Sequence, residues 1–348
     1  MIQDIRNYGA IPDATTNCTS AINNALAVGD VMIQNGVFQI ESDIIIPSNR
    51  TIYIKNAKLI LRSGYYTNMF RNADFNNGNT NIQIIGQGHA SICGNSAGHV
   101  DGYATWGGET DNTYRYCVGV FVNVSGFEIS GITFSDNVHW GVWFQGCSGY
   151  ADGRKSVIKN WVANMYNIVA NQDCFDFLFG THDIDISNCK FNTNDDPFAI
   201  ASCNKSGNWI RTSATPTGVR GVGDIYNLSF TNLFMKKSQY HAFVVLTGDG
   251  NKIHDITFNG YRALQCQYFC YFGLTGYYDV APTVNDCYNF SLNNVTVEAQ
   301  TDTGAVVKAL ESCKQITFTN FVNNTGKADY ALTAGKTGLN NYINGVLQ

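Results

Sequence analysis

A five-residue pattern, apolar–x–apolar–x–Asn or Gly, recurs between residues 52 and 320 and constrains the fold more than any other feature of this 348-residue chain. Each copy predicts a short two-faced strand, followed by a residue that tolerates left-handed backbone and turns the chain onto its next face. A weaker copy ends at Asn160. The clear copies end at Asn56, Gly86, Gly131, Asn188, Asn232, Gly260, Asn294 and Asn320.

The closing residues follow one another at intervals of 26 to 34 residues, except for two intervals of 45 and 44 residues. Strand-only repeats of this length predict an all-β parallel β-helix, in which each coil covers the hydrophobic interior of its neighbour. Nine or more coils, about 4.8 Å apart, would make a rod of order 43 Å. The two long intervals predict loop insertions at about residues 90–116 and 203–223.

The open end of such a stack needs a cap. Residues 19–27 predict a short helix with Ile22 and Leu26 on one face, which would cover the first coil. The following VMIQNGVFQI predicts two strands with a turn at its Asn-Gly pair. We expect a single domain over 1–348, with a lead-in segment and cap (1–45), coils (46–325) and a C-terminal tail (326–348).

Composition excludes several classes of partner. The net charge is −5 and the sequence has no large Lys/Arg cluster, which argues against a nucleic-acid partner. The sequence contains no run of about 18 apolar residues, so it predicts no membrane span. The N-terminus lacks the features of a signal peptide, so a leader has been removed or export follows another route. The eleven cysteines show no metal-ligand spacing and predict small buried residues of the solenoid.

Acidic residues and one histidine recur at a similar phase of neighbouring coils. Asp195 and Asp196 follow Asn188 by 7 and 8 residues, and His241 follows Asn232 by 9. Equal phase on adjacent coils predicts that these side chains stack on one face. Asp173 follows Asn160 by 13 residues, so it joins them only if a bulge near 163–170 absorbs about five residues.

Converging carboxylates are the usual apparatus for cleaving a glycosidic bond. Adjacent acids push their pKa values apart, which keeps one carboxyl protonated near neutral pH. Neighbouring side chains on a regular strand point to opposite faces, however. Asp195 and Asp196 can therefore act at one site only if the backbone turns or bulges at these two residues. A solvated acid pair in an Asx-turn before Pro197 is the alternative.

These motifs resemble the pectin-lyase-like right-handed β-helices, and specifically the polygalacturonase-type glycoside hydrolases of family 28. The segment 171–176 resembles the family's Asn-Thr-Asp motif, Asp195-Asp196 its Asp-Asp motif, and Tyr240-His241-Ala242 its Gly-His-Gly motif. The resemblance covers about residues 5–262. The N-terminal NYGAIPD…AINNALA is also similar to segments of β-helix carbohydrate enzymes and phage tailspikes.

The resemblance implies a polysaccharide hydrolase that inverts configuration and needs no metal or cofactor. Asp195 would be the general acid, Asp173 and Asp196 would hold and deprotonate water, and His241 would support the charge state of the acid. Asn171 and Tyr240, from the same motifs, would contact the substrate.

The family's Arg-Ile-Lys motif, which grips the substrate carboxylate, is missing. The chain has CQYFCYF at that place, after a solitary Arg262. Either the sugar is neutral or otherwise decorated, or cations arrive from elsewhere. The second insertion offers Lys205, Arg211 and Arg220 as such cations, and the alternative for these residues is a role as solubilising loop charges. Aromatic residues that would suit stacking on sugar rings, or alternatively pack in the core, are Trp106, Trp140, Trp143, Tyr268 and Tyr271.

Two other functions stay open. A polysaccharide lyase on this scaffold would need a Ca²⁺ site and an Arg or Lys base, and few basic residues lie at the phase of the acids. A phage or prophage tailspike that binds a glycan would suit the polar Asn/Thr/Gly-rich surface and the drifting motifs. Phage fibres of this shape are typically trimers, so that resemblance implies a homotrimer. Both readings place the protein outside the cell or on a virion.

Overall fold

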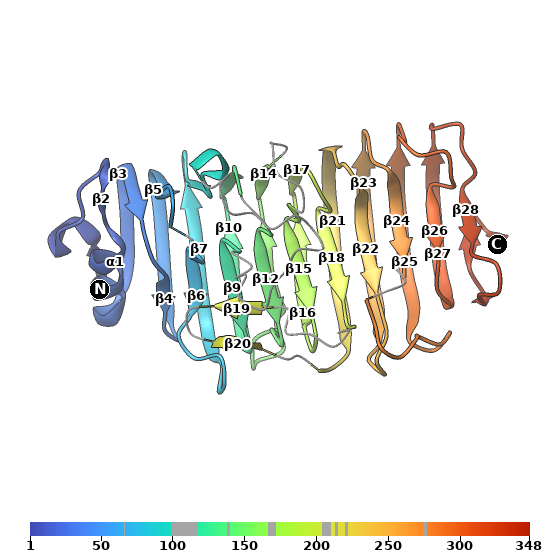
Figure 1. The fold of residues 1–348 in the computed structure, drawn as a ribbon, viewed down its shortest axis with the longest axis horizontal. Coiled ribbons are helices and arrows are strands. Elements are labelled where there is room, and N and C mark those ends of the chain that lie inside the picture. The colour runs from blue at the N-terminus through green and yellow to red at the C-terminus, as the bar shows by residue number, and fades with distance from the viewer. Residues whose placement is uncertain are drawn as a thin grey trace.

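The computed structural model describes residues 1–65, 67–98, 117–137, 140–165, 172–203, 210–212, 215–219, 222–273 and 277–348. The chain winds into a right-handed parallel β-helix, a rod with the N-terminus at one end and the C-terminus at the other (Figure 1). Successive coils pair in parallel, as in β23 (Ile253–Ala263) beside β25 (Cys287–Val297). The predicted fold class is therefore confirmed.

Sheet A is the longer of the two main sheets. In the described part of the chain it has 19 strands. Besides β23 and β25 these are β1 (Ile2–Asp4), β2 (Asp13–Asn17), β3 (Asp30–Ile40), β5 (Arg50–Leu61), β7 (Asn79–Gln87), β8 (Ser91–Cys93), β10 (Val124–Ser130), β11 (Thr133–Ser135), β13 (Ser156–Lys159), β14 (Val162–Asn164), β16 (His182–Ser187), β17 (Lys190–Asn192), β21 (Ile225–Lys237), β27 (Cys313–Asn323), β29 (Gly338–Leu339), β30 (Tyr342–Ile343) and β31 (Val346–Leu347).

Sheet B is made of shorter strands, ten of them within the described residues. In order along the rod they are β4 (Ile44–Ile46), β6 (Phe70–Asn72), β9 (Gly119–Val122), β12 (Val142–Gln145), β15 (Phe175–Leu178), β18 (Phe198–Ala201), β22 (His241–Leu246), β24 (Tyr268–Phe272), β26 (Val307–Ala309) and β28 (Tyr330–Leu332). Between the sheets, phenylalanines of successive coils stack, with the rings of Phe144 and Phe177 5.5 Å apart. This interior is the core that the repeat predicts.

Asparagine and glycine make the corners. Eight of the nine predicted closing residues have positive φ, for example Asn232 (54°) and Gly260 (77°). The prediction is wrong for Gly86, which stays outside the left-handed region, while Gly88 enters it (64°). A second row of left-handed residues, which includes Asn227 and Asp255, lies five residues before most of the closing residues and did not enter the predicted pattern.

The ends of the rod agree with the sequence in part. Helix α1 (Thr19–Val28) forms as predicted and buries Ile22 and Leu26. The prediction of two separate strands is wrong, because β3 is continuous, but Asn35 (φ 54°) makes a left-handed corner within it, as Asn56 does within β5. The C-terminal tail adds β28 to sheet B and β29 to β31 to sheet A. Two short 3₁₀ helices, η1 (Ile5–Tyr8) and η2 (Ser96–Gly98), complete the elements.

Both predicted insertions lie partly outside the described residues. Within the first, β8 belongs to the stack, where it pairs with β5 and β11. Within the second, β19 (Ile210–Thr212) and β20 (Thr215–Val219) form an antiparallel pair. All eleven cysteines are buried free thiols. No helix in the described ranges is long and apolar enough to cross a bilayer.

Sheet B is also buried on its outer face. Trp143, Leu178, Val244 and Tyr271 of four different strands belong to one buried cluster there, separate from the interior core. A strand buried on both sides reads as a continuous apolar run. This explains segments such as VVL in β22, and it makes any carboxylate on this face unusual.

Candidate active site

The predicted acids and histidine meet at the N-terminal ends of three neighbouring strands of sheet B. Asp173 lies two residues before β15, and Asp195 and Asp196 lie just before β18. His241 is the first residue of β22. Since these strands are parallel neighbours, their starts lie at the same edge of the sheet.

The three carboxylates converge. One side-chain oxygen from each of Asp173, Asp195 and Asp196 lies within 4.8 Å of the other two. Asp173 and Asp196 are buried, with 7% and 6% exposure, whereas Asp195 is partly exposed. Oxygen donors this close would also suit a divalent cation. Asp195 is therefore the acid most open to a substrate.

Hydrogen bonds fix the cluster. The backbone N–H of Asp196 donates to Asp173 Oδ1 at 3.0 Å. The backbone N–H of His241 donates to Asp196 Oδ1 at 2.7 Å. His241 Nδ1 lies 2.9 and 3.1 Å from the two oxygens of Asp196. The histidine thus holds Asp196, and its link to Asp195 is indirect.

Burial and mutual repulsion destabilise the ionised form of the clustered carboxyls and so raise their pKa values. Burial raises the pKa of Asp173 well above its usual range, and the charges of Asp195, Asp176 and Asp196 raise it further. Burial likewise raises the pKa of Asp195, followed by the charges of Asp196 and Asp176. Asp176 is therefore a fourth carboxylate of the site. It lies on β15 with 3% exposure and was not assigned a role from the sequence.

The local backbone meets the condition set for the Asp195–Asp196 pair. Residues 193–197 lie between β17 and β18 in a bend, so adjacent side chains need not point to opposite faces. The hydroxyls of Thr193 and Ser238 donate to the carbonyl of Asp195 at 2.6 and 2.9 Å. The bulge expected near 163–170 falls mostly outside the described residues.

Aromatic residues surround the cluster. Tyr240 is 36% exposed, and burial followed by the charges of Asp195 and Asp196 raises its pKa. Tyr268 lies beside His241, with ring centroids 5.9 Å apart. Trp140 is buried against Trp143 at 5.2 Å in the outer cluster of sheet B. Asn171, Lys205, Trp106 and Arg220 lie outside the described residues, as does the side chain of Arg211.

The structure adds a cation that the motifs did not reveal. Lys308 on β26 lies over the rings of Tyr268 and Tyr271, at 4.8 and 5.7 Å from their centroids. No sequence motif marks it, because it comes from a three-residue strand two coils beyond His241. Arg262, by contrast, is paired with Glu298 at 2.9 Å on sheet A.

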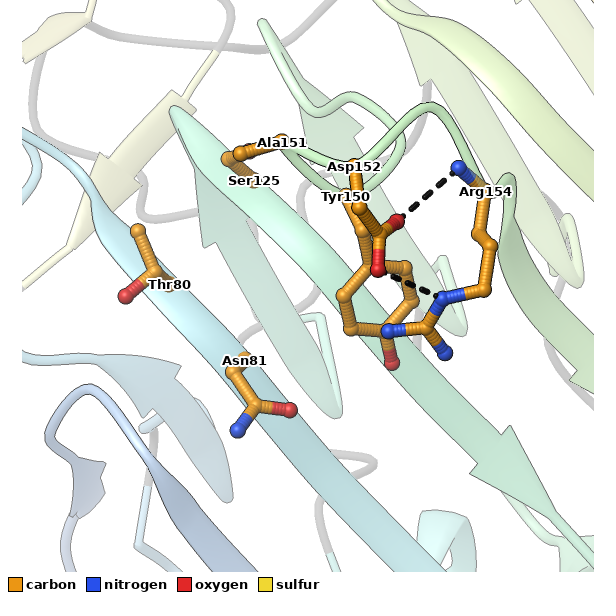
Figure 2. Close-up of a pocket in the computed structure, with 7 residues that line it drawn as sticks. All are labelled: Thr80, Asn81, Ser125, Tyr150, Ala151, Asp152 and Arg154. Carbon is orange, nitrogen blue, oxygen red and sulfur yellow. Dashed lines mark hydrogen bonds and ion pairs between the residues drawn. The ribbon is translucent and has the colours of Figure 1, made fainter.

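A separate hollow of about 340 Å³ lies beside β7 and β10 (Figure 2). Arg154 and Asp152 pair there at 2.8 Å, and the Arg154 guanidinium covers the Tyr150 ring at 4.4 Å. None of the residues that line it is a predicted site residue. The hollow is therefore distinct from the acid cluster.

Solved structures resemble this chain along almost its whole length. A hyperthermoactive exopolygalacturonase from Thermotoga maritima is 13% identical with a TM-score of 0.64, over 98% of this chain and 92% of that one. A family 28 exopolygalacturonase from Yersinia enterocolitica is 14% identical with a TM-score of 0.63, over 98% and 78%. The chain shares their fold. At this identity the likeness concerns the fold alone.

The N-terminal fragment of bacteriophage phi29 gene product 12 is also similar. It is 17% identical with a TM-score of 0.53, over 94% of this chain and 65% of that one. No family model matches the sequence, and no curated protein matches it significantly. Enzymes and a phage protein thus share this β-helix architecture with the chain.

Proposed function

We propose that the protein is a glycoside hydrolase that cleaves a polysaccharide at the acid cluster, outside the cell or on a virion. The observation that carries this proposal is the convergence of Asp173, Asp195 and Asp196, with oxygens within 4.8 Å of one another. Burial and mutual repulsion make such a cluster costly when it is ionised, and perturbed carboxyls of this kind concentrate at functional sites.

Asp195 is the general acid in this proposal. Burial and the charges of Asp196 and Asp176 raise its pKa, which favours the protonated carboxyl that a general acid needs, and it is the least buried member of the trio. Asp173 and Asp196 hold the attacking water. His241 positions Asp196 through two hydrogen-bonding groups, its backbone N–H and Nδ1.

The proposed inversion of configuration rests on the resemblance to family 28 enzymes. Carboxyl groups of inverting enzymes are typically about 6.5–9.5 Å apart, and those of retaining enzymes about 5–5.5 Å. The nearest oxygens here are closer than the inverting range. The anomer released at early times, followed by NMR, decides this part of the proposal.

A tailspike-type protein that binds a glycan without cleaving it is the second candidate. Two observations favour it, namely the missing Arg-Ile-Lys motif and the similarity to the phi29 protein. A homotrimer belongs to this candidate. A polysaccharide lyase is the third candidate, and it differs from the others in forming an unsaturated product.

The test is turnover on a panel of pectic, capsular and cell-wall polysaccharides, with reducing ends and ultraviolet absorbance followed together. We expect new reducing ends without new absorbance, and loss of at least about 10²-fold in Asp195→Asn because proton transfer contributes that much. We also expect EDTA to have no effect, since no metal takes part.

The other outcomes assign the other candidates. New absorbance would establish a lyase. Binding without turnover, equal in the parent and Asp195→Asn, would establish a glycan-binding spike. Hydrolysis that EDTA abolishes would show that the three carboxylates act through a cation.

A further inference from the structure

A row of side chains leads away from the acid cluster along sheet B. β22, β24 and β26 lie side by side in that order (Figure 1). His241 is in register with Tyr268, and Tyr271 with Lys308. Because neighbouring strands are about 4.8 Å apart, Lys308 lies roughly 10 Å along the rod from the strand of His241.

The ammonium group of Lys308 is held in place. It lies over two tyrosine rings and donates to Tyr268 Oη at 3.4 Å. Attraction between a cation and an aromatic face fixes the group without neutralising its charge. Among the described residues Lys308 forms no ion pair with a carboxylate. It is partly exposed, so it keeps donors for a further partner.

The acid beside Tyr268 is already engaged. Asp302 Oδ1 accepts the backbone N–H of Gly304 at 2.8 Å, and Oδ2 accepts from the Gln267 amide at 3.5 Å. Asp302 also bonds the phenol of Tyr268, whose pKa is raised to about 12 by burial and by this neighbour. Tyr268 therefore stays neutral, donates to Asp302 and accepts from Lys308. This leaves Lys308 as the unneutralised charge of the row.

We propose that Lys308 binds an anionic group of the substrate, which makes the substrate an acidic polysaccharide. The proposal rests on the proposed function, because the ligand is the polymer that reaches the acid cluster. An anionic chain would be repelled by the ionised carboxylates of the acid cluster, and a fixed cation beyond them offsets that repulsion. Two strands lie between them, β22 and β24, and β24 brings tyrosines and no charge to this face. The anionic group is therefore recognised three coils from Asp195 and Asp196 and two coils from His241.

The test measures binding to an Asp195→Asn protein, so that no polymer is consumed. The probes are polygalacturonate, alginate and dextran sulfate, each compared with a neutral counterpart (the carboxyl-reduced polymers and dextran). We expect Lys308→Met to weaken binding of an acidic probe about tenfold or more, the effect of losing a charge-assisted hydrogen bond. Binding of its neutral counterpart should not change.

Lys314→Met is the matched control. Lys314 lies over the Tyr288 ring at 5.3 Å on sheet A, in a similar setting away from the acids. We expect it to leave all affinities unchanged, and Lys308→Arg to keep most of the binding. The preferred probe, a uronate or a sulfated polymer, identifies the anion.

Two outcomes would overturn the assignment. One is equal weakening of acidic and neutral probes by Lys308→Met, which would indicate a structural role for Lys308. The other is that the Asp195→Asn protein with intact Lys308 binds no acidic probe. The proposed hydrolysis fails separately, if acidic probes bind through Lys308 and the parent with an intact Asp195 does not cleave them.

Discussion

Asp173 illustrates at the residue scale why this site opposes folding stability. Its carboxyl is buried beside three other acids, and its folded pKa is raised above the unfolded value. A raised carboxyl pKa means that the folded state binds more protons than the unfolded state. Stability is therefore fully present below the unfolded pKa and declines as the pH rises through the folded pKa. Buried acids that oppose stability in this way are typical of functional sites.

Asp173→Asn should therefore stabilise the protein at pH 8, by about 0.5–2 kcal/mol, and have little effect at pH 3.5. Asparagine keeps an oxygen that accepts the Asp196 N–H, so the main change is the removed charge. Urea denaturation at both pH values measures it. Destabilisation that is larger at pH 8 than at pH 3.5 would contradict the buried-charge account.

Asp183 provides a control of opposite sign. Its pKa is lowered, because hydrogen bonds from His182 and Asn227 outweigh the effect of burial. The stability from this lowered pKa is present above the unfolded pKa and is lost as the pH falls through the folded pKa. Asp183→Asn should therefore destabilise the protein at pH 8 and lose that effect in acid.

The strands, at the scale of elements, show what the sequence could predict. The Asn and Gly corners follow from local backbone preference, so Asn188, Asn232 and Asn294 were found from the repeat alone. Gly86 was misassigned, because it continues strand β7 and the left-handed residue is Gly88. Asn35 is left-handed and bends β3 without ending it. Local preference predicts where the backbone can turn left-handed, whereas the continuation of a strand through that corner depends on its pairing with the next coil.

The site was predictable to the same extent. Asp195 and His241 lie at fixed distances from corners, so counting along the chain brought them together. The proposed role of Lys308 depends on the pairing of β24 with β26, a relation between residues 37 positions apart (Tyr271 and Lys308) that no local motif encodes. The role of Asp176 likewise depends on charges brought in by the neighbouring coil.

Asn232 tests the corner rule. It has φ 54° and donates from its amide to Asn188 Oδ1 at 2.7 Å. Asn232→Ala should destabilise the protein by about 1–2 kcal/mol, because alanine is strained in left-handed backbone. Asn232→Gly should cost less than about 1 kcal/mol, since glycine adopts that backbone freely. Thermal or urea denaturation compares the two variants.

Asn192→Ala measures the contribution of a side-chain amide hydrogen bond without any effect of left-handed backbone. Asn192 donates to Asn164 Oδ1 at 2.8 Å without positive φ. Its loss should cost about 0.5 kcal/mol, the low end for an exposed hydrogen bond. Equal costs for Asn232→Ala and Asn232→Gly would assign the effect at Asn232 to the amide bond and refute the corner rule.

At the scale of the whole molecule, the rod is a one-dimensional stack in which each coil contacts its neighbours. In such solenoids stability is approximately a sum over coils and their interfaces, so damage at one end need not reach the other. The acids lie at the starts of β15 and β18, in the middle of the rod (Figure 1). Helix α1 covers the N-terminal end with Ala25 and Leu26 fully buried.

Leu26→Ala should therefore unfold the first coils and spare the site. Loss of a buried leucine costs about 2–5 kcal/mol. A terminal coil is stabilised by only one neighbouring coil, so we expect this loss to open it locally. Hydrogen exchange should accelerate in β1, β3 and β5, while β15, β18 and β24 keep their protection. Leu292→Ala, an equally buried leucine of β25, should instead accelerate exchange around β23 to β27. A uniform increase of the hydrogen-exchange rate along the rod in Leu26→Ala would mean that the coils unfold as one unit. The stability of the acid cluster would then depend on the cap, more than 140 residues away in sequence.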